Sequence, residues 1–321
     1  MELYEAMKNL TPKLFSEFDT VQISLNVDEE TEKPNMKLSN YYELIKMDET
    51  ESLPIIAIVA HYDAMSPAPE FTFGVDSAGS GTIAVLEVGR RLKKMLKEMR
   101  SIAYHDVLLI LTSGSTINFE GTNELLNKFD ESMLKRIEFA LCLDSIGNGN
   151  SLYLHSNSEL SNQRRQQIVQ SLIDIGKISG VQIKMADSIG STNSVNWEHE
   201  IFHKRSIFAA TLSGLDNANR YPYISSQLFD NSLNTTTLNT NIEIVADHLI
   251  RIICSFSEAP CKGHLTLTSH SDTNYVAILT NYFSAHPRYP SLIAKGTAQH
   301  KDFEKVLAII SSYCLIGEMP I

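Results

Sequence analysis

The chain has 321 residues, and its 27 Lys and Arg against 38 Asp and Glu give a formal net charge of −11. Proteins that bind the nucleic-acid backbone are usually basic, so this balance argues against that class. Hydrophobic residues make up 43% of the chain, which is enough apolar surface for a folded core and excludes global disorder. No apolar run reaches the roughly 20 residues that a membrane-spanning helix needs. The opening MELYEAMKNLTPKLF also lacks the basic start and apolar block of a secretory leader.

Residues 1–52 are polar, with acidic patches, and predict an N-terminal lead-in. From Leu53 onward, short apolar runs alternate with longer segments of helical period, which is typical of a sheet covered by helices on both faces. The first run, 53–60, is apolar throughout and predicts a central strand. The helix expected next, at about 79–100, has one apolar stripe, and we expect its basic residues to face solvent. These basic residues are Arg90, Arg91, Lys93, Lys94 and Lys97.

The alternation of strands and helices continues to about residue 257. Further strands are expected at 106–113, 137–144, 151–155, 181–186 and 207–213. Further helices are expected at 120–129, within 159–179, at 197–203 and at 237–257. Two more helical stretches, 273–285 and 302–314, predict a helical C-terminal extension over 258–321. The predicted fold class is therefore α/β, a three-layer sandwich with a mostly parallel mixed sheet over 53–257.

Chemically capable side chains follow the predicted strands. His61 and Asp63 end the first central strand, Asp76 precedes the first long helix in GVDSAGSG, and Asp144 ends the strand FALCLD. The carboxyl ends of strands in an open α/β sheet form the place where ligands bind. One imidazole and two carboxylates are a plausible zinc set, with Asp63 orienting the His61 ring. The alternative is that His61 is a structural residue with no metal.

The order of these motifs resembles the M28 family of zinc aminopeptidases, over roughly residues 53–257. The resemblance rests on HYD, then GVDSAGSG opening a helix, then a strand leading to a Gly-Thr turn, then LDSIG. It implies that His61 and Asp144 ligate one zinc ion and that Asp76 bridges two. It also implies a cis peptide bond between Asp76 and Ser77.

The chain departs from this family at the next motif, a Glu-Glu pair that supplies the general base and a zinc ligand. Alignment on Gly121 and Thr122 places Ser115 and Thr116 at those positions. A hydroxyl with an ordinary pKa cannot act as a base near neutral pH, and a neutral threonine is a poor zinc ligand. The resemblance therefore implies a peptidase scaffold that is not an enzyme.

A second departure concerns the last histidine ligand of the family. It is expected within 214–230, and that stretch contains no histidine. His199 and His203 precede the strand at 207–213 and are expected to have core or surface roles. We therefore expect no cofactor and interpret His61, Asp76 and Asp144 as a vestigial metal site that could still hold a single zinc ion.

A closer resemblance is to the nicalin family, which comprises nicastrin-like proteins of the endoplasmic reticulum. It rests on IVAHYDA at 58–64, LCLDSIGNGNSLYLH at 141–155 and WEHEIFHKRSIFAATLS at 197–213. It implies a lumenal, non-catalytic subunit of a membrane complex, held by a C-terminal transmembrane helix that this sequence lacks. Because a leader and much of the N-terminal region are also missing, we expect a truncated chain. The sequon at Asn234 agrees with a lumenal location.

The nicalin resemblance also implies partners and a process. The partners are the nodal modulator protein and a small multipass membrane protein, and together they act behind the Sec translocon in multipass membrane-protein biogenesis. Modulation of Nodal-type signalling or of receptor assembly is implied as well. Two alternatives stay open: a weakly active or single-zinc M28-type aminopeptidase, and a binding module that holds a peptide terminus without cleaving it. The four cysteines are too scattered for a disulfide framework, although Cys254 and Cys261 could pair.

Overall fold

The computed structural model describes eleven segments of the chain, all within one compact unit, Met36–Ile321. The described residues are 39–50, 52–66, 68–100, 102–157, 160, 162–186, 195–217, 230–256, 273–290, 296–311 and 318–320. Among them, no helix is both long and apolar enough to cross a membrane.

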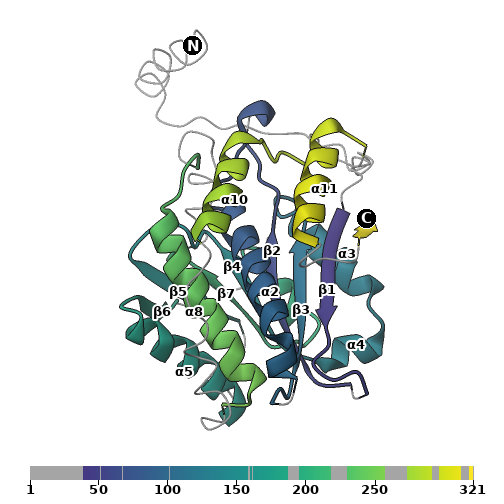
Figure 1. The fold of residues 1–321 in the computed structure, drawn as a ribbon, viewed down its shortest axis with the longest axis vertical. Coiled ribbons are helices and arrows are strands. Elements are labelled where there is room, and N and C mark those ends of the chain that lie inside the picture. Colours follow the sequence, from purple (N-terminus) through teal and green to yellow (C-terminus); the bar gives the residue numbers. More distant parts are fainter. Residues whose placement is uncertain are drawn as a thin grey trace, which may run out of the picture. The chain divides into compact units, whose positions relative to one another are not determined.

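A mixed sheet forms the middle layer, with the strand order β6-β5-β7-β4-β2-β3-β1-β8 (Figure 1). Its strands are β1 Ser39–Ile45, β2 Ile55–His61, β3 Asp106–Thr112, β4 Ile137–Asp144, β5 Ser151–His155, β6 Gln182–Met185, β7 Ala209–Ser213 and β8 Glu318–Pro320. The central strands β3, β2, β4 and β7 run parallel, whereas β1, β8 and the β5–β7 pair introduce antiparallel contacts. The carboxyl ends of the four central strands therefore lie at one edge of the sheet.

Helices cover both faces of this sheet, which confirms the predicted three-layer α/β class. The described helices are η1 Pro69–Phe71, α2 Gly79–Met99, α3 Glu120–Lys128, α4 Glu131–Arg136, α5 Gln163–Ile178, α6 His199–His203, α8 Thr235–Ile253, α10 Thr273–Ala285 and α11 Ala298–Ser311. Side chains of α2, α5, α8, α10 and α11 pack on one face, and those of α3 and α6 pack on the other.

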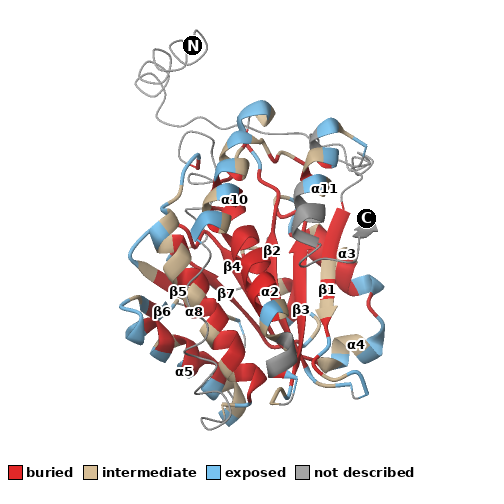
Figure 2. Ribbon diagram, in the orientation of Figure 1, coloured by how far each residue is buried: buried red, intermediate tan, exposed pale blue. Residues whose placement is uncertain are grey.

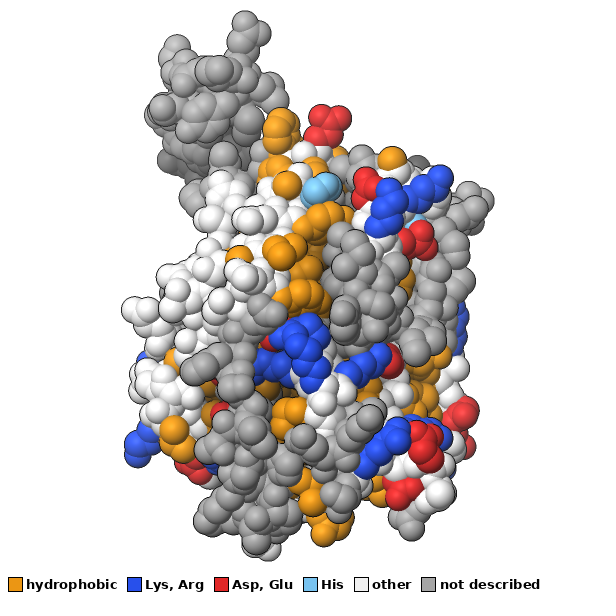
Figure 3. Space-filling view, viewed as in Figure 1, with side chains coloured by type: hydrophobic (Ala, Val, Ile, Leu, Met, Phe, Trp, Pro, Cys, Tyr) orange, Lys and Arg blue, Asp and Glu red, His pale blue; other side chains and the backbone are white. Residues whose placement is uncertain are grey.

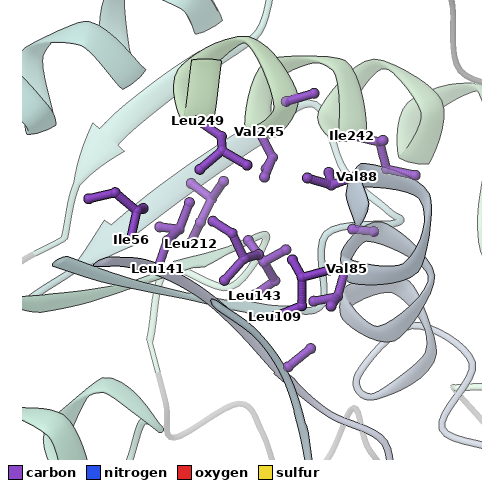
Figure 4. Close-up of a cluster of buried hydrophobic side chains, with 14 of the residues drawn as sticks. Ile56, Val85, Val88, Leu109, Leu141, Leu143, Leu212, Ile242, Val245 and Leu249 are labelled. Carbon is purple, nitrogen blue, oxygen red and sulfur yellow. The ribbon is translucent and has the colours of Figure 1, made fainter. Parts of the chain in front are cut away.

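The two cores follow from the alternation of side chains along each strand. Along β2, Ile56, Ile58 and Ala60 enter one core, whereas Ile55, Ala57 and Val59 enter the other. Figure 4 shows side chains of the sheet meeting those of α2 and α8 in the larger core. Figure 2 shows that the central strands are buried along their length. Each fully buried Ile or Leu contributes about 1.5–3 kcal/mol.

The limits of the sheet differ from the predicted domain boundaries at both ends of the chain. The predicted lead-in, 1–52, contains β1, which pairs with β3 and β8. The predicted C-terminal extension, 258–321, contributes Phe283 and Phe303 to the larger core. These contacts join segments that are distant in sequence, so the local composition on which the boundaries were based does not reveal them.

The basic face of α2 is also less exposed than predicted. Arg90 and Arg91 are only 8% and 9% exposed, and both bind the buried carboxylate of Glu87. Basic side chains gather over α2 on the face shown in Figure 3. The reason for the burial is that α2 contacts both α8 and α10, which cover part of the face that was expected to point to solvent.

Two cysteines lie among the described residues. Cys142 is buried and free, whereas Cys254, at the end of α8, is disulfide-bonded. The predicted pairing of Cys254 with Cys261 involves a residue outside the described ranges.

Candidate functional site

The strand topology brings the predicted site residues to one edge of the sheet. His61 ends β2 and Asp144 ends β4, and these two strands are parallel neighbours. Asp63 follows β2, and Asp76 lies just before α2. All four side chains are buried, with exposed fractions between 1% and 7%. The local reason is that apolar parallel strands end together here, so that each polar residue after a strand is enclosed by its neighbours.

Asp76 is held by the turn that follows β4. Its Oδ1 accepts a hydrogen bond from the backbone N–H of Gly147 at 2.6 Å, and its Oδ2 accepts one from the Asn148 side chain at 2.9 Å. Burial raises the pKa of Asp76 to about 6, although the Gly147 hydrogen bond acts in the opposite direction. The implied cis bond between Asp76 and Ser77 is wrong, because no cis peptide bond occurs among the described residues, which include both.

Asp63 binds the turn between β3 and α3. Its Oδ2 accepts the Gly114 N–H at 2.5 Å, and its Oδ1 accepts the Ser115 hydroxyl at 2.7 Å. The carboxylate was expected to orient His61, but both of its oxygens hold this turn instead. Its effect on His61 is electrostatic, since it raises the pKa of the imidazole. The backbone N–H of Ser115 also donates to Oδ1 of Asp63, at 3.2 Å, so this turn holds the carboxylate through both its backbone and the Ser115 side chain.

Thr116, at the second position of the family's Glu-Glu pair, does not form with any described residue a side-chain hydrogen bond of the kind that Ser115 forms with Asp63. Its Oγ1 is buried and has no hydrogen-bond partner in the described part of the chain. Neither Ser115 nor Thr116 therefore supplies a carboxylate at this position, and the Ser115 hydroxyl is committed to Asp63.

Glu198 is the residue of this site that the sequence analysis missed. It immediately precedes α6, and its Oε1 accepts hydrogen bonds from the hydroxyls of Thr112 at 2.7 Å and Thr122 at 2.6 Å. Its Oε2 lies 3.9 Å from Nδ1 of His61 and has no hydrogen-bond partner among the described residues. The available signal was the Trp-Glu-His-Glu motif, which was noted for its specificity but was not assigned to the site.

The charges at this edge act on one another. Burial by itself would lower the pKa of His61, but Glu198, Asp144 and Asp63 together raise it to about 9. Burial raises the pKa of Asp144 to about 6, against the attraction of His61. His61 thus lies among carboxylates at the carboxyl ends of β2 and β4.

The metal prediction can be compared with this donor set. Both oxygens of Asp76 and both of Asp63 accept hydrogen bonds, and Oδ1 of Asp144 accepts one from the Ser145 hydroxyl at 2.6 Å. Within the described ranges, no three His, Cys, Asp or Glu side chains are arranged to hold a metal ion. The residues as placed therefore do not fit a zinc centre, and zinc binding by His61 stays a prediction for measurement.

The remaining predicted positions are the last histidine ligand of the family, His199 and His203. Most of the stretch 214–230, in which the last family ligand was expected, lies outside the described residues. His199 is fully buried and its Nδ1 lies 2.9 Å from the Thr211 hydroxyl, so of the two expected roles, core or surface, it has the core one. His203 is exposed at the end of α6.

Comparisons with known proteins support this fold and family. Residues 44–249, more than half of the chain, match the model of peptidase family M28. BOS complex subunit ncln of Danio rerio is 29% identical over 276 residues, which cover 77% of this chain and 48% of that protein. BOS complex subunit NCLN of Rattus norvegicus is 32% identical over 227 residues, which cover 65% of this chain and 39% of that protein.

Among solved structures, the gamma-secretase component nicastrin has a similar fold, with a TM-score of 0.66 at 14% identity. The match covers 86% of this chain and 56% of nicastrin. The chain spans less than half the length of the two curated relatives. It belongs to peptidase family M28 and is a nicalin-like member of it.

Proposed function

We propose that this chain is the M28-like domain of a non-catalytic subunit of a membrane-protein complex, acting on the lumenal side of the endoplasmic reticulum. The observation that carries the proposal is the turn after β3. Ser115 stands where the family has its general base, and its hydroxyl donates to Asp63 at 2.7 Å. A site that has exchanged its base for a structural hydrogen bond cannot activate water by the family's route.

The names of the relatives support membership in a complex, since both curated proteins are called BOS complex subunits. We propose the partners that the resemblance implies: a nodal modulator protein, a small multipass membrane protein and the Sec translocon. The process is the biogenesis and assembly of multipass membrane proteins, which would include receptors and components of Nodal-type signalling. A membrane helix outside this chain would hold the domain at the bilayer.

Two features support the lumenal location. Cys254 is disulfide-bonded, and disulfides persist in oxidising compartments such as the endoplasmic-reticulum lumen. The sequon residue Asn234 is exposed at the start of α8, where a glycan would extend into solvent. Its Oδ1 accepts the N–H groups of Thr236 at 2.9 Å and Thr237 at 3.1 Å, so Asn234 also caps α8.

Location and assembly are tested together in microsomes from cells that express the full-length tagged protein. We expect the domain to resist added protease, to be sensitive to endoglycosidase and to co-purify with its partners in near-equal amounts. Thr236→Ala abolishes the sequon but keeps the Asn234 cap, so it should remove the glycan without destabilising the fold. Recovery of the protein as a cytosolic monomer would contradict the proposal.

A single-zinc aminopeptidase is the second candidate function. It is favoured by His61 and Asp144, which end neighbouring strands as in a metal-dependent member of the family. Both carboxylate oxygens of Asp76 already accept hydrogen bonds, from Gly147 and Asn148, and this argues against zinc binding by Asp76. Turnover that is sensitive to chelators would favour this candidate over the first.

A further inference from the structure

Arg288 follows α10 and is the largest of the fully buried side chains, with 1% exposure. Its Nε donates to the carbonyl of Tyr62 at 2.9 Å, its Nη1 to that of Phe283 at 3.2 Å, and its Nη2 to that of Gly74. A buried guanidinium is costly unless its donors are used, so these carbonyls hold the side chain in one place.

The backbone of Arg288 binds the same loop. Its N–H donates to the Thr72 carbonyl at 2.7 Å, and its own carbonyl accepts the Ala64 N–H at 3.0 Å. The loop that leads from β2 to α2 is therefore attached at several points to a residue 226 positions later in the chain. Phe303 of α11 adds a stacked contact with Tyr62, with ring centroids 4.7 Å apart.

A buried carboxylate holds the other side of this loop. Asp230 accepts the N–H groups of Asp76 at 2.5 Å and Ser77 at 3.1 Å, and it also accepts the Ser77 hydroxyl. Its own carbonyl accepts the Val75 N–H at 3.2 Å. Residues 75–77 of this turn thus donate their backbone N–H groups to Asp230, and the Gly74 carbonyl accepts a hydrogen bond from Arg288.

The shape of the turn depends on these contacts. Gly74 has a φ of +55°, and a Cβ at this position would lie 2.4 Å from the Cβ of Ala64. The loop is therefore tightly packed against the end of β2, and Asp76 reaches Gly147 only from this arrangement. Local hydrogen bonds around η1 hold the middle of the loop, whereas Tyr62, Ala64 and residues 74–77 are bound by Arg288 and Asp230.

We propose that residues 286–290 form a strap, and that its docking through Arg288 sets the conformation of the loop at 62–77. Arg288 acts as a positioning residue for Asp63 and Asp76 at the carboxyl edge of the sheet. A force or partner that lifts the C-terminal helices would release this loop before the rest of the sheet unfolds. The strap therefore connects the C-terminal extension to the candidate site, and this inference does not depend on the proposed function.

The test is hydrogen exchange of the full chain, followed by mass spectrometry of peptides that cover residues 62–79. Arg288→Met removes all three side-chain donors. Arg288→Lys keeps the charge, but its single ammonium group cannot reach the carbonyls of Tyr62, Gly74 and Phe283 together. The matched control is Arg164→Met, because Arg164 makes a 2.7 Å bond with Glu138 and lies over the Phe256 ring, far from this loop.

We expect both Arg288 variants to exchange at least about tenfold faster over 62–79, with peptides from α5 and β6 unchanged. Arg164→Met should leave the exchange of 62–79 unchanged. Asp230→Asn should accelerate exchange over 74–79 in the same way. Uniform acceleration across the sheet in the Arg288 variants, or no acceleration at 62–79, would overturn the proposal.

Discussion

Glu138, near the amino ends of the central strands, and Asp76 and Asp144, at their carboxyl ends, have pKa values shifted in opposite directions. At the amino ends, a hydrogen bond from His105 at 2.7 Å outweighs burial and, with Arg164, lowers the pKa of Glu138 to about 2. At the carboxyl ends, burial raises the pKa values of Asp76 and Asp144 to about 6. Glu138 therefore stabilises the fold as a charged group, whereas charge on Asp76 and Asp144 costs stability. Asp106, at the amino end of β3, behaves like the second pair, because burial raises its pKa too.

This difference separates Glu138, which is paired with Arg164, from Asp76 and Asp144 of the candidate site. Carboxylates that are kept at a cost are typical of functional sites, whereas paired charges are typical of structural networks. In this chain Asp76 accepts hydrogen bonds from Gly147 and Asn148, and Asp144 accepts one from Ser145, so the surrounding structure holds both carboxylates. The candidate site therefore keeps buried carboxylates whose oxygens already accept hydrogen bonds.

Glu198→Ala should cause the largest loss of stability among these variants. It leaves the hydroxyls of Thr112 and Thr122 without their acceptor and removes the carboxylate beside His61. Breaking a buried charge pair in this way costs about 3–5 kcal/mol, and urea unfolding measures the loss. Glu198→Gln, which keeps the shape and one acceptor, should lose less. Wild-type stability in Glu198→Ala would mean that Glu198 does not hold this edge.

Glu138→Gln tests the opposite end of the sheet. Because the folded-state pKa lies at about 2, below the ordinary 4.5, Glu138 contributes stability above pH 4.5 that is lost as pH falls through about 2. With discount for partial exposure, the variant should lose about 1–2 kcal/mol at pH 7. The difference from wild type should vanish near pH 2, and an equal difference at both pH values would contradict the assignment.

Asp144→Asn should have a smaller effect of the opposite sign. The folded-state pKa of about 6 lies above the ordinary 3.8, so the contribution of Asp144 is fully present below pH 3.8 and is lost as pH rises through about 6. At pH 8 the neutral amide should therefore raise stability by about 1 kcal/mol. Thermal unfolding between pH 4 and 8 measures this, and a loss of stability at pH 8 would show that the charge is needed.

Glu131→Ala should change nothing measurable. Glu131 pairs with Lys135 on the surface of α4 at 2.9 Å, with both side chains more than two thirds exposed. Exposed pairs of this kind contribute little. The variant is the matched acidic control for Glu198→Ala in the same unfolding experiment.

The sequence predicted the central elements well because their signals are local. The apolar run that became β2 and the positions of His61 and Asp144 at strand ends follow from composition and spacing alone. β1 was missed because its residues, SNYYELI, lie between polar stretches and form a strand only through pairing with β3 and β8. Its contacts are long-range, and one sequence does not reveal them.

The site was harder to predict than the fold for the same reason. Asp63 was assigned to His61 because the two lie two positions apart in the chain, but its partner is Ser115, 52 positions later. Glu198 reaches His61 from before α6, and Arg288 reaches Tyr62 from the C-terminal extension. Residue types suggested where chemistry would gather, whereas the partners depended on tertiary packing.

We propose that this edge of the sheet keeps the form of a peptidase site without its chemistry. The most direct test measures the zinc content of the purified protein and its aminopeptidase turnover, before and after chelation and with zinc restored. Our account predicts no turnover above background under any of these conditions and no change in stability on chelation. One equivalent of zinc with turnover that chelation abolishes and zinc restores would contradict it.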